Sequence, residues 1–548
     1  MARMFDQIKQ LLSNSLPRFS RRDLFARAGW ATAPALLAGS ATGAPNAAKA
    51  LAIGPKIYES IGVTPLINCR GTLTAIGGSL ELDAVRNAKE AAALHFVPLD
   101  ELFDAIGARL AAITGAEWGT VTSGCAAAMS HATAACVAGA NPDLHVRIPN
   151  LAGFQKDEVI IPKRSRNVYD AAIRAVGVRI VEIDTADDLK AAIGPKTAMI
   201  YVFARDGMDR DPLPFETLTA IAQEHKVPVL VDAAAEILTI PNVHLQKGAT
   251  LVAYSGGKCI RGPQCAGVLL GRKDLVQAAW IHGAPHHGYG RAMKVGKEEA
   301  IGMLAAIEAW VKRDHAAEWK TWMSWMSHIA SKVQTVEGVT ASVREPRGLS
   351  NRTPGLTIRW NADKLNITGA ELTDILYTTE PRVALAGGGG GRQRDSAGGG
   401  DTGISLAAYM MAPGEDKIVA DRIHSILSQK RATKPKVAPQ QPATNLNGRW
   451  DVTIEFTAGV TQHALHLKQE GAQIVGTHQG DFVSRDLSGR IEGDKVTMRS
   501  SYTEEHGDNL GFTFTGQYSN GSLAGDLDMG EYRKAKWTAK PHQFGARG

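Results

Sequence analysis

Short apolar runs alternate with segments of helical length through the first half of the chain. Such runs predict strands, and the segments between them predict helices that pack on the strands. This alternation indicates a mostly parallel sheet covered by helices on both faces, whose ligands bind at the carboxyl ends of the strands. The predicted strands cover 159–161, 179–183, 198–203, 229–231 and 251–254, and the predicted helices cover 81–94, 99–114, 169–176, 186–193 and 215–225.

The pattern changes after residue 310. Trp and Met side chains recur at helical spacing from Trp319 to Val333, which is typical of a core-facing helix. We therefore place a large domain at 51–310 and a small α/β domain at 311–429. A nearly all-glycine segment, 387–400, interrupts the small domain; its composition suits a lid or a slack connection, and we favour the connection. Strands of the small domain are predicted at 356–360, 382–386 and 404–409, and helices at 368–376 and 416–428.

The C-terminal part has a different composition. Residues 430–444 are rich in Pro, Lys and Gln and are interpreted as a linker. Residues 445–548 contain about eight short alternating segments separated by Gly and Asn, which predicts an antiparallel β-barrel or sandwich. The triplet Gly448-Arg449-Trp450 resembles the start of a lipocalin-like barrel. Paired acids, a nucleophile or a metal cluster do not stand out there, so we favour a binding or packing accessory over a second enzyme.

The first fifty residues are interpreted as a leader. Arg21 and Arg22 form a twin-arginine pattern, which a mildly apolar stretch at 28–37 and the small-residue site Ala48-Lys49-Ala50 follow. We expect export of the folded protein to the periplasm by the twin-arginine pathway; a disordered basic tail is the alternative. The apolar stretch is too short and too interrupted for a bilayer, so no membrane span is expected after leader cleavage.

The charge balance argues against a nucleic-acid partner. The net charge is +6, but residues 1–50 hold seven Lys or Arg against two Asp, and 430–444 hold four Lys or Arg and no acid. The leader therefore carries +5 and the linker +4, which leaves the folded parts at about −3.

Metal and disulfide chemistry are not expected either. The five cysteines lack C-x-x-C spacing, which argues against a zinc site and a disulfide framework. His282, His286 and His287 cluster without a nearby carboxylate or thiol, so we expect no metal.

A lysine and a carboxylate each follow an apolar strand. The apolar run 249–254 leads to Lys258, which stands in a loop rich in Gly and Pro. A lysine in a dry site can lose its proton near neutral pH and attack a carbonyl such as the aldehyde of pyridoxal phosphate (PLP). Asp232 ends another apolar strand and is the carboxylate that a protonated pyridine nitrogen requires.

A third motif suits a phosphate. Ser123, Gly124 and Cys125 lead from a strand into an Ala-rich helix, whose free N–H groups and positive end attract an anion. Ser255 can add a hydroxyl to the same phosphate. The phosphate seat, the acid and the lysine follow one another in the order found in PLP enzymes of the aspartate aminotransferase fold.

Three segments resemble the selenocysteine synthase-like group of fold type I PLP-dependent enzymes: 255–275, 231–236 and 290–299. That group includes L-seryl-tRNA(Sec) selenium transferase and D-glucosaminate-6-phosphate ammonia-lyase, and the resemblance covers roughly residues 57–429. It implies an aspartate aminotransferase-like large domain, in which Lys258 forms the internal aldimine and Asp232 meets the ring nitrogen. The resemblance also implies phosphate contacts from Ser123, Gly124, Cys125 and Ser255.

One position departs from the family pattern. The family commonly has His-Arg-Asn-x-Tyr-Asp, and this chain has Ser165 where the His would stand, followed by matching Arg166, Asn167, Tyr169 and Asp170. A hydroxyl cannot stack on the cofactor ring, so the reaction type could differ from that of the relatives. Candidate substrate-binding residues are Arg70, Asn167, Arg261, Arg291, Lys294 and Arg382, with Arg291 and Lys294 expected to act across a dimer interface.

We therefore predict a PLP-dependent lyase or transferase acting on a small-molecule amino substrate. The resemblance implies elimination or replacement on an amino acid or amino sugar acid, in a homodimer or larger homo-oligomer. Two alternatives remain: a selenium transferase acting on seryl-tRNA, which requires an RNA partner in the cytoplasm, and a non-catalytic protein of the PLP fold, which Ser165 suggests.

Overall fold

The computed structural model describes residues 51–386, 400–432, 440–503 and 509–543. The predicted leader, nearly all of the glycine-rich segment and the middle of the predicted linker lie outside these residues. The chain divides into two units, Met1–Pro65 and Leu66–Gly548. The described part of the first unit carries a short 3-10 helix, η1 (Glu59–Ile61), and the second unit carries the elements described below.

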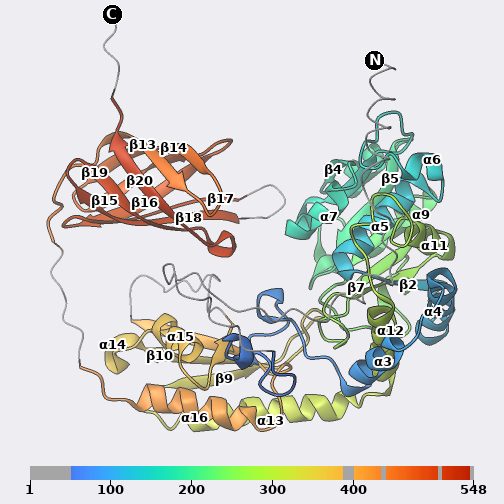
Figure 1. Ribbon diagram of the computed structural model, residues 1–548, viewed down its shortest axis with the longest axis horizontal. Helices are drawn as coiled ribbons and strands as arrows, with labels where there is room; N and C mark the ends of the chain where they lie inside the picture. Colours follow the sequence, from blue (N-terminus) through green and yellow to red (C-terminus); the bar gives the residue numbers. More distant parts are fainter. Residues whose placement is uncertain (1–50, 387–399, 433–439, 504–508, 544–548) are drawn as a thin grey trace, which may run out of the picture. The chain divides into compact units, whose positions relative to one another are not determined.

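A seven-stranded sheet forms the centre of the large domain (Figure 1). The pairs β7–β6, β6–β5, β5–β3 and β3–β4 are parallel, whereas β8 is antiparallel to both β2 and β7. The predicted mostly parallel sheet is confirmed. The prediction lacked β8, which returns antiparallel because the loop 256–266 contains no crossover helix. The strands lie in the order β2 (Trp118–Thr122), β8 (Gly267–Gly271), β7 (Leu251–Ser255), β6 (Val229–Asp232), β5 (Thr197–Phe203), β3 (Glu158–Pro162) and β4 (Arg179–Ile183).

Two hydrophobic layers attach helices to the two faces of this sheet. Successive strand residues enter opposite layers, as Leu230 and Val231 do, because side chains alternate along a strand. The helices α5 (Gly124–Ala138), α6 (Pro142–His145), α7 (Ala171–Arg174) and α11 (Lys273–Ile281) cover one face. The helices α3 (Asp83–Ala93), α4 (Leu99–Thr114), α8 (Ala186–Ala192), α9 (Phe215–Glu224), α10 (Val243–Gln246) and α12 (Lys297–Lys312) cover the other.

The helix predicted at 169–176 is shorter than expected. The 3-10 turn η3 (Lys163–Ser165) is followed by a second one, η4 (Val168–Asp170), and then by the four-residue α7. The Asn167 side chain accepts a hydrogen bond from Tyr169 N, so it starts a tight turn where a longer helix was predicted. Within the described part of the chain, none of the helices has the length and apolar character needed to cross a bilayer.

The small domain is built on a three-stranded antiparallel sheet with the order β12-β10-β9. A separate parallel pair joins β1 to β11, and the bridge between Ala386 and Ser405 continues this pair toward β12. A 3-10 turn, η2 (Thr74–Ile76), follows β1. The elements are β1 (Ile67–Cys69), β9 (Thr340–Arg344), β10 (Gly355–Asn361), β11 (Val383–Leu385), β12 (Asp401–Ala407), α13 (His315–Val333), α14 (Ala362–Leu365), α15 (Gly369–Thr378) and α16 (Glu415–Ser428).

Helix α13 only partly matches the predicted core helix. Met326, Ile329 and Val333 are buried in the core of the small domain, as predicted. Trp319 and Trp322, nearer the start of the helix, remain half-buried. The later part of α13 therefore packs in the core, whereas Trp319 and Trp322 near its start line a second cavity.

The C-terminal strands form a closed antiparallel barrel, so the predicted barrel or sandwich is a barrel. Each strand pairs with its sequence neighbours, and β13 closes on β20. Alternate side chains point inward, as Trp450, Val452 and Ile454 do on β13. The strands are β13 (Gly448–Glu455), β14 (Val460–Glu470), β15 (Gln473–Gln479), β16 (Ser484–Glu492), β17 (Lys495–Thr503), β18 (Asn509–Ser519), β19 (Ser522–Asp528) and β20 (Lys534–Pro541), with the 3-10 turn η6 (Gly530–Tyr532) before β20.

A chain of polar side chains runs from the inside of this barrel to the exposed Asp481. Ser500 Oγ lies 2.7 Å from His478 Nδ1, and His478 Nε2 lies 2.8 Å from His463 Nδ1. His463 Nε2 in turn lies 3.5 Å from Asp481 Oδ2. Burial, together with the charges of His463 and Arg485, lowers the pKa of His478 to about 3. His478 is therefore neutral at pH 7, and folding opposes its protonation.

We expect the barrel to lose stability as the pH falls from 7 to 5. Unfolded His478 takes up a proton near pH 6.5, whereas folded His478 does so only near pH 3, so the unfolded state binds more protons between these values. At pH 5 the free energy of unfolding should fall by about 2 kcal/mol from this residue alone. Hydrogen exchange of peptides from β15 and β17, followed by mass spectrometry at both pH values, measures the loss.

Two variants identify the source of that pH dependence. His478→Gln should flatten it, because glutamine does not titrate. His466→Gln changes an exposed histidine on β14 and should leave it unchanged. If His478→Gln has the same pH dependence as the unaltered chain, the assignment to His478 is wrong.

Candidate active site

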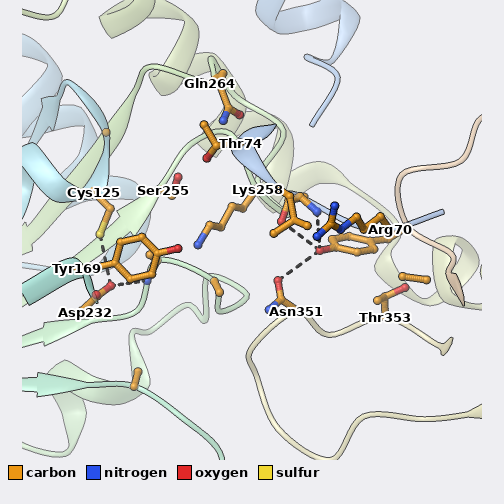
Figure 2. Close-up of a pocket in the computed structure, with 18 of the residues that line it drawn as sticks. Arg70, Thr74, Cys125, Tyr169, Asp232, Ser255, Lys258, Gln264, Asn351 and Thr353 are labelled. Carbon is orange, nitrogen blue, oxygen red and sulfur yellow. Dashed lines mark hydrogen bonds between the residues drawn. The ribbon is translucent and has the colours of Figure 1, made fainter. Parts of the chain in front are cut away.

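A cavity of about 1350 Å³ opens at the carboxyl ends of the central strands (Figure 2). The start of α5, the ends of β6 and β7, the loop after β7 and parts of the small domain form its walls. This is the predicted place for a ligand of such a sheet. All six residues predicted to hold the cofactor line the cavity: Ser123, Gly124, Cys125, Asp232, Ser255 and Lys258.

Asp232 is the buried carboxylate of this cavity, with 1% of its surface exposed. Its Oδ1 accepts hydrogen bonds from the backbone N of Ala234 (3.0 Å) and from Sγ of Cys125 (3.5 Å). Its Oδ2 accepts one from the hydroxyl of Tyr201 (3.1 Å). Burial raises the pKa of the Asp232 carboxyl, and these three donors together with the charge of Lys258 act against the rise. Because the donors are neutral, the carboxylate is suited to a cation placed against it.

Tyr201 links Asp232 to a residue outside the cavity lining. The Tyr201 hydroxyl, on β5, accepts a hydrogen bond from Asn167 Nδ2 at 3.1 Å and donates its own proton to Asp232. Asn167 Nδ2 also donates to the backbone O of Ser165 at 2.8 Å. Asn167, a predicted substrate ligand, is thus a partner of Tyr201 and is not among the residues that line the cavity. The sequence prediction missed Tyr201, although a buried tyrosine hydroxyl usually has a hydrogen-bond partner.

Helix α5 presents its amino end to the cavity. Gly124, Cys125 and Ala126 line the wall, and the first N–H groups of a helix have no acceptor within the helix. Gly124 has φ = +82°, a backbone conformation that favours glycine. A Cβ on Gly267 of β8 would lie 2.6 Å from Cys125 N and closer still to the carbonyl carbon of Gly124. Gly267 therefore allows the sheet and this helix end to approach each other.

Lys258 extends into the cavity from the loop after β7 (Figure 2). A tight turn begins at this residue, with Arg261 N donating to Lys258 O at 3.0 Å. A Cβ on Gly256 would lie 2.6 Å from Met303 Sδ, so the loop passes close to α12. Across the described ranges, no residue forms a hydrogen bond or ion pair with the Lys258 ammonium group. Its Nζ is available to a ligand in the cavity.

These groups fit PLP. The buried carboxylate of Asp232 suits a pyridinium nitrogen, and the amino end of α5 with Ser123 and Ser255 suits a phosphate. Lys258 stands on the same cavity wall with an unpaired amine, as an aldehyde requires. PLP supplies an electron sink for carbanion chemistry when it is bound.

Two arginines line the cavity, Arg70 after β1 and Arg344 at the end of β9. Arg344 Nε donates to Thr357 Oγ1 at 3.1 Å. Arg382, the predicted small-domain arginine, instead donates from Nε to the Tyr377 O at 2.7 Å and lies over the Tyr377 ring. Because that contact turns it away from the cavity lining, the small-domain arginine at the cavity is Arg344, which the prediction missed.

The other predicted substrate ligands lie outside this lining. Arg261 Nε donates to the Leu80 O at 3.0 Å, and the residue lines a second cavity. Arg291 Nη1 lies 3.4 Å from the Pro285 O, and neither Arg291 nor Lys294 is among the lining residues. Their role across a subunit interface stays a prediction.

Ser165 is buried in η3 and does not line the cavity, whereas Tyr169 does (Figure 2). In this part of the chain the aromatic ring at the cavity wall therefore comes from Tyr169.

Comparisons with known proteins agree with the fold. The aminotransferase class-V family matches residues 165–341. A 5'-C-glycyluridine monooxygenase-decarboxylase from Streptomyces sp is 33% identical over 296 residues, covering 52% of this chain and 72% of the relative. The D-glucosaminate-6-phosphate ammonia lyase of Salmonella typhimurium (strain 14028s / SGSC 2262) is 30% identical over 329 residues, covering 58% of this chain and 86% of the relative. A solved structure of D-glucosaminate-6-phosphate ammonia-lyase is 27% identical, with a TM-score of 0.60, and the match covers 68% of this chain and 99% of that one.

Fold and site together define a PLP-dependent enzyme of fold type I, a lyase or transferase. Within this class, the chain belongs to the selenocysteine synthase-like group. The predicted resemblance to that group is thus confirmed, together with the cofactor.

We expect Tyr201→Phe to weaken PLP binding about tenfold or more, because a hydrogen bond to a charged group contributes about 1.5–3 kcal/mol. Loss of this donor raises the pKa of Asp232 further, so the weakening should grow as the pH falls. The dissociation constant of PLP, measured by equilibrium dialysis at two pH values, reports the effect. Tyr254→Phe is a matched control, since the Tyr254 hydroxyl is equally buried and bonds Asn242. An equal loss in both variants would show a general effect of the missing hydroxyl.

Proposed function

We propose that this PLP enzyme catalyses elimination or replacement on a small amino acid or amino sugar acid. The observation that supports it most is the single cavity wall on which Lys258 and Asp232 stand, facing Arg70 and Arg344 across an interior of about 1350 Å³. That size suits a small substrate beside the cofactor. The ammonia lyase of Salmonella typhimurium, whose name describes the loss of ammonia from an amino sugar acid, supports the reaction class.

Separate residues of the cavity transfer the proton, hold the cofactor ring and bind the substrate. Lys258 Nζ moves the proton at Cα of the substrate, as a base first and as an acid afterwards. Asp232 holds a proton on the ring nitrogen of the cofactor, and Tyr201 and Cys125 keep its carboxylate oriented. Arg70 and Arg344 bind the substrate carboxylate, because guanidinium groups match carboxylate geometry.

Lys258→Ala should lower turnover about a thousandfold or more, because general acid–base catalysis is lost together with cofactor attachment. Borohydride reduction and peptide mapping should label residue 258 of the unaltered chain only. Product release from amino acids and amino sugar acids, followed by ammonia and keto-acid assays, gives the activity. Lys273→Ala is the control, since Lys273 lies over the ring of Trp118 away from the cavity.

The outcomes separate an enzyme from a binding protein. A label at Lys258 with no product from any amine would support the non-catalytic alternative, and a label at another lysine would remove the basis of the proposal. Selenium transfer to seryl-tRNA is the weaker alternative, because the folded part of the chain is slightly acidic.

We further propose export to the periplasm, which the Arg21-Arg22 pair supports. Changing both to lysine should leave the protein in the cytoplasm, whereas the unaltered chain should reach the periplasmic fraction. Equal distribution of the two in cell fractionation would contradict export by this route.

We also infer a homodimer or larger homo-oligomer. Arg291 and Lys294 match the family motif but do not line the cavity of their own chain, which supports a role at a neighbouring subunit. The mass of the purified protein in solution, measured by light scattering, tests this inference.

A further inference from the structure

A second cavity, of about 570 Å³, lies beside the catalytic one. The loop after Lys258, the end of α12, the first turns of α13 and residues 345–352 form its walls. Neither Lys258 nor Asp232 lines it. Its volume is in the range of cavities that hold small molecules.

Aromatic side chains make up much of this second cavity. Trp310, Trp319 and Trp322 all line it, and Tyr409 closes one side. The Trp319 and Trp322 rings meet edge to face with centroids 6.5 Å apart, and Trp322 meets Tyr409 in the same way at 6.3 Å. Both tryptophans are half-buried, so they leave ring surface open to a planar ligand.

The charges of the lining are mostly positive. Arg313 and Glu318 neutralise each other through two hydrogen bonds, of 3.0 and 2.9 Å. Arg261, Lys320 and Arg352 then face one carboxylate, Glu345. The guanidinium of Arg352 lies over the Trp319 ring, with its carbon 5.8 Å from the centroid. An anion bound there would meet three cationic side chains beside an aromatic surface.

The two cavities share a wall. Glu345, Pro346 and Tyr409 line both of them. The Tyr409 hydroxyl bonds Thr72 Oγ1 (3.1 Å) and donates to Asn351 Oδ1 (3.3 Å), and Thr72 and Asn351 line the catalytic cavity. A ligand against Trp322 and Tyr409 therefore stands one side chain away from the catalytic cavity.

We propose that the second cavity binds a planar aromatic anion, such as an aryl carboxylate or aryl phosphate. The tryptophan rings stack on the ring of the ligand, and Arg261, Lys320 and Arg352 bind its charge. Arg261 stands in the same loop as Lys258, but it lines this second cavity and not the catalytic one. The proposal goes beyond the catalytic function and does not depend on which substrate the enzyme uses.

Titration of the full chain, purified and saturated with PLP, tests the site with 2-naphthoate as probe. Calorimetry should show saturable binding, and quenching of tryptophan fluorescence should follow the same curve. The neutral analogue 2-naphthylmethanol should bind about tenfold more weakly, because it lacks the charge that the cations recognise. Trp319→Leu and Arg352→Gln should each weaken naphthoate binding about tenfold.

Two controls separate this site from others. Arg147→Gln removes an arginine that lies over Phe154 at the same 5.8 Å but outside the cavity, and it should change nothing. Arg344→Gln alters the catalytic cavity and should also leave naphthoate binding unchanged. Absence of saturable binding, or weakening by Arg344→Gln but not by Arg352→Gln, overturns the proposal. A change of molecular mass in Trp319→Leu, measured by light scattering, overturns it as well, because a second copy would then cover this face.

Discussion

Burial of the Asp232 carboxylate is the constraint on which the site depends. Moving a carboxylate out of water costs several kcal/mol unless hydrogen bonds and an opposite charge compensate for it. Three neutral donors surround Asp232 and none of them supplies a charge. The Lys258 ammonium is the one nearby charge of the described residues that favours the Asp232 anion, and a cationic ring against the carboxylate would add a second, so cofactor binding and the stability of this strand end are coupled.

The carboxyl ends of the strands determine where the other cavity residues lie. Parallel strands β6 and β7 end side by side, which places Asp232 near Ser255 and the loop of Lys258. The reversed strand β8 runs between β7 and β2, and its Gly267 lets the amino end of α5 approach the sheet. A side chain at that position would displace the helix end that receives the phosphate. One antiparallel strand thus sets the distance between the phosphate seat and the lysine.

The sequence predicted the parts of this site that depend on local pattern. Lys258, Asp232 and Ser123 each stand at a strand end marked by an apolar run followed by Gly, Ala or Pro, so their common edge follows from the alternation of strands and helices. Tyr201 could not be found in this way, because it lies inside an apolar strand and only the pairing of β5 with β6 places its hydroxyl at Asp232. Arg344 and Arg382 both lie at the ends of small-domain strands, and only the contact of Arg382 with Tyr377 decides between them. Strand β8 runs antiparallel because the loop before it contains no helix. The apolar residues at 267–271 do not indicate the direction of this strand.

The parallel pairing of β1 with β11 makes the small domain discontinuous in sequence. Ile67 and Cys69 belong to the same hydrophobic core as Val383 and Leu385, although residues 70–382 separate the two segments along the chain. Arg70 and Thr72 come directly after β1, so they are attached to the small domain and any rigid-body rotation of that domain would carry them with it. A fragment beginning at residue 311 would lack one strand of its own core, so the small domain completes its core only with a segment that precedes most of the large domain.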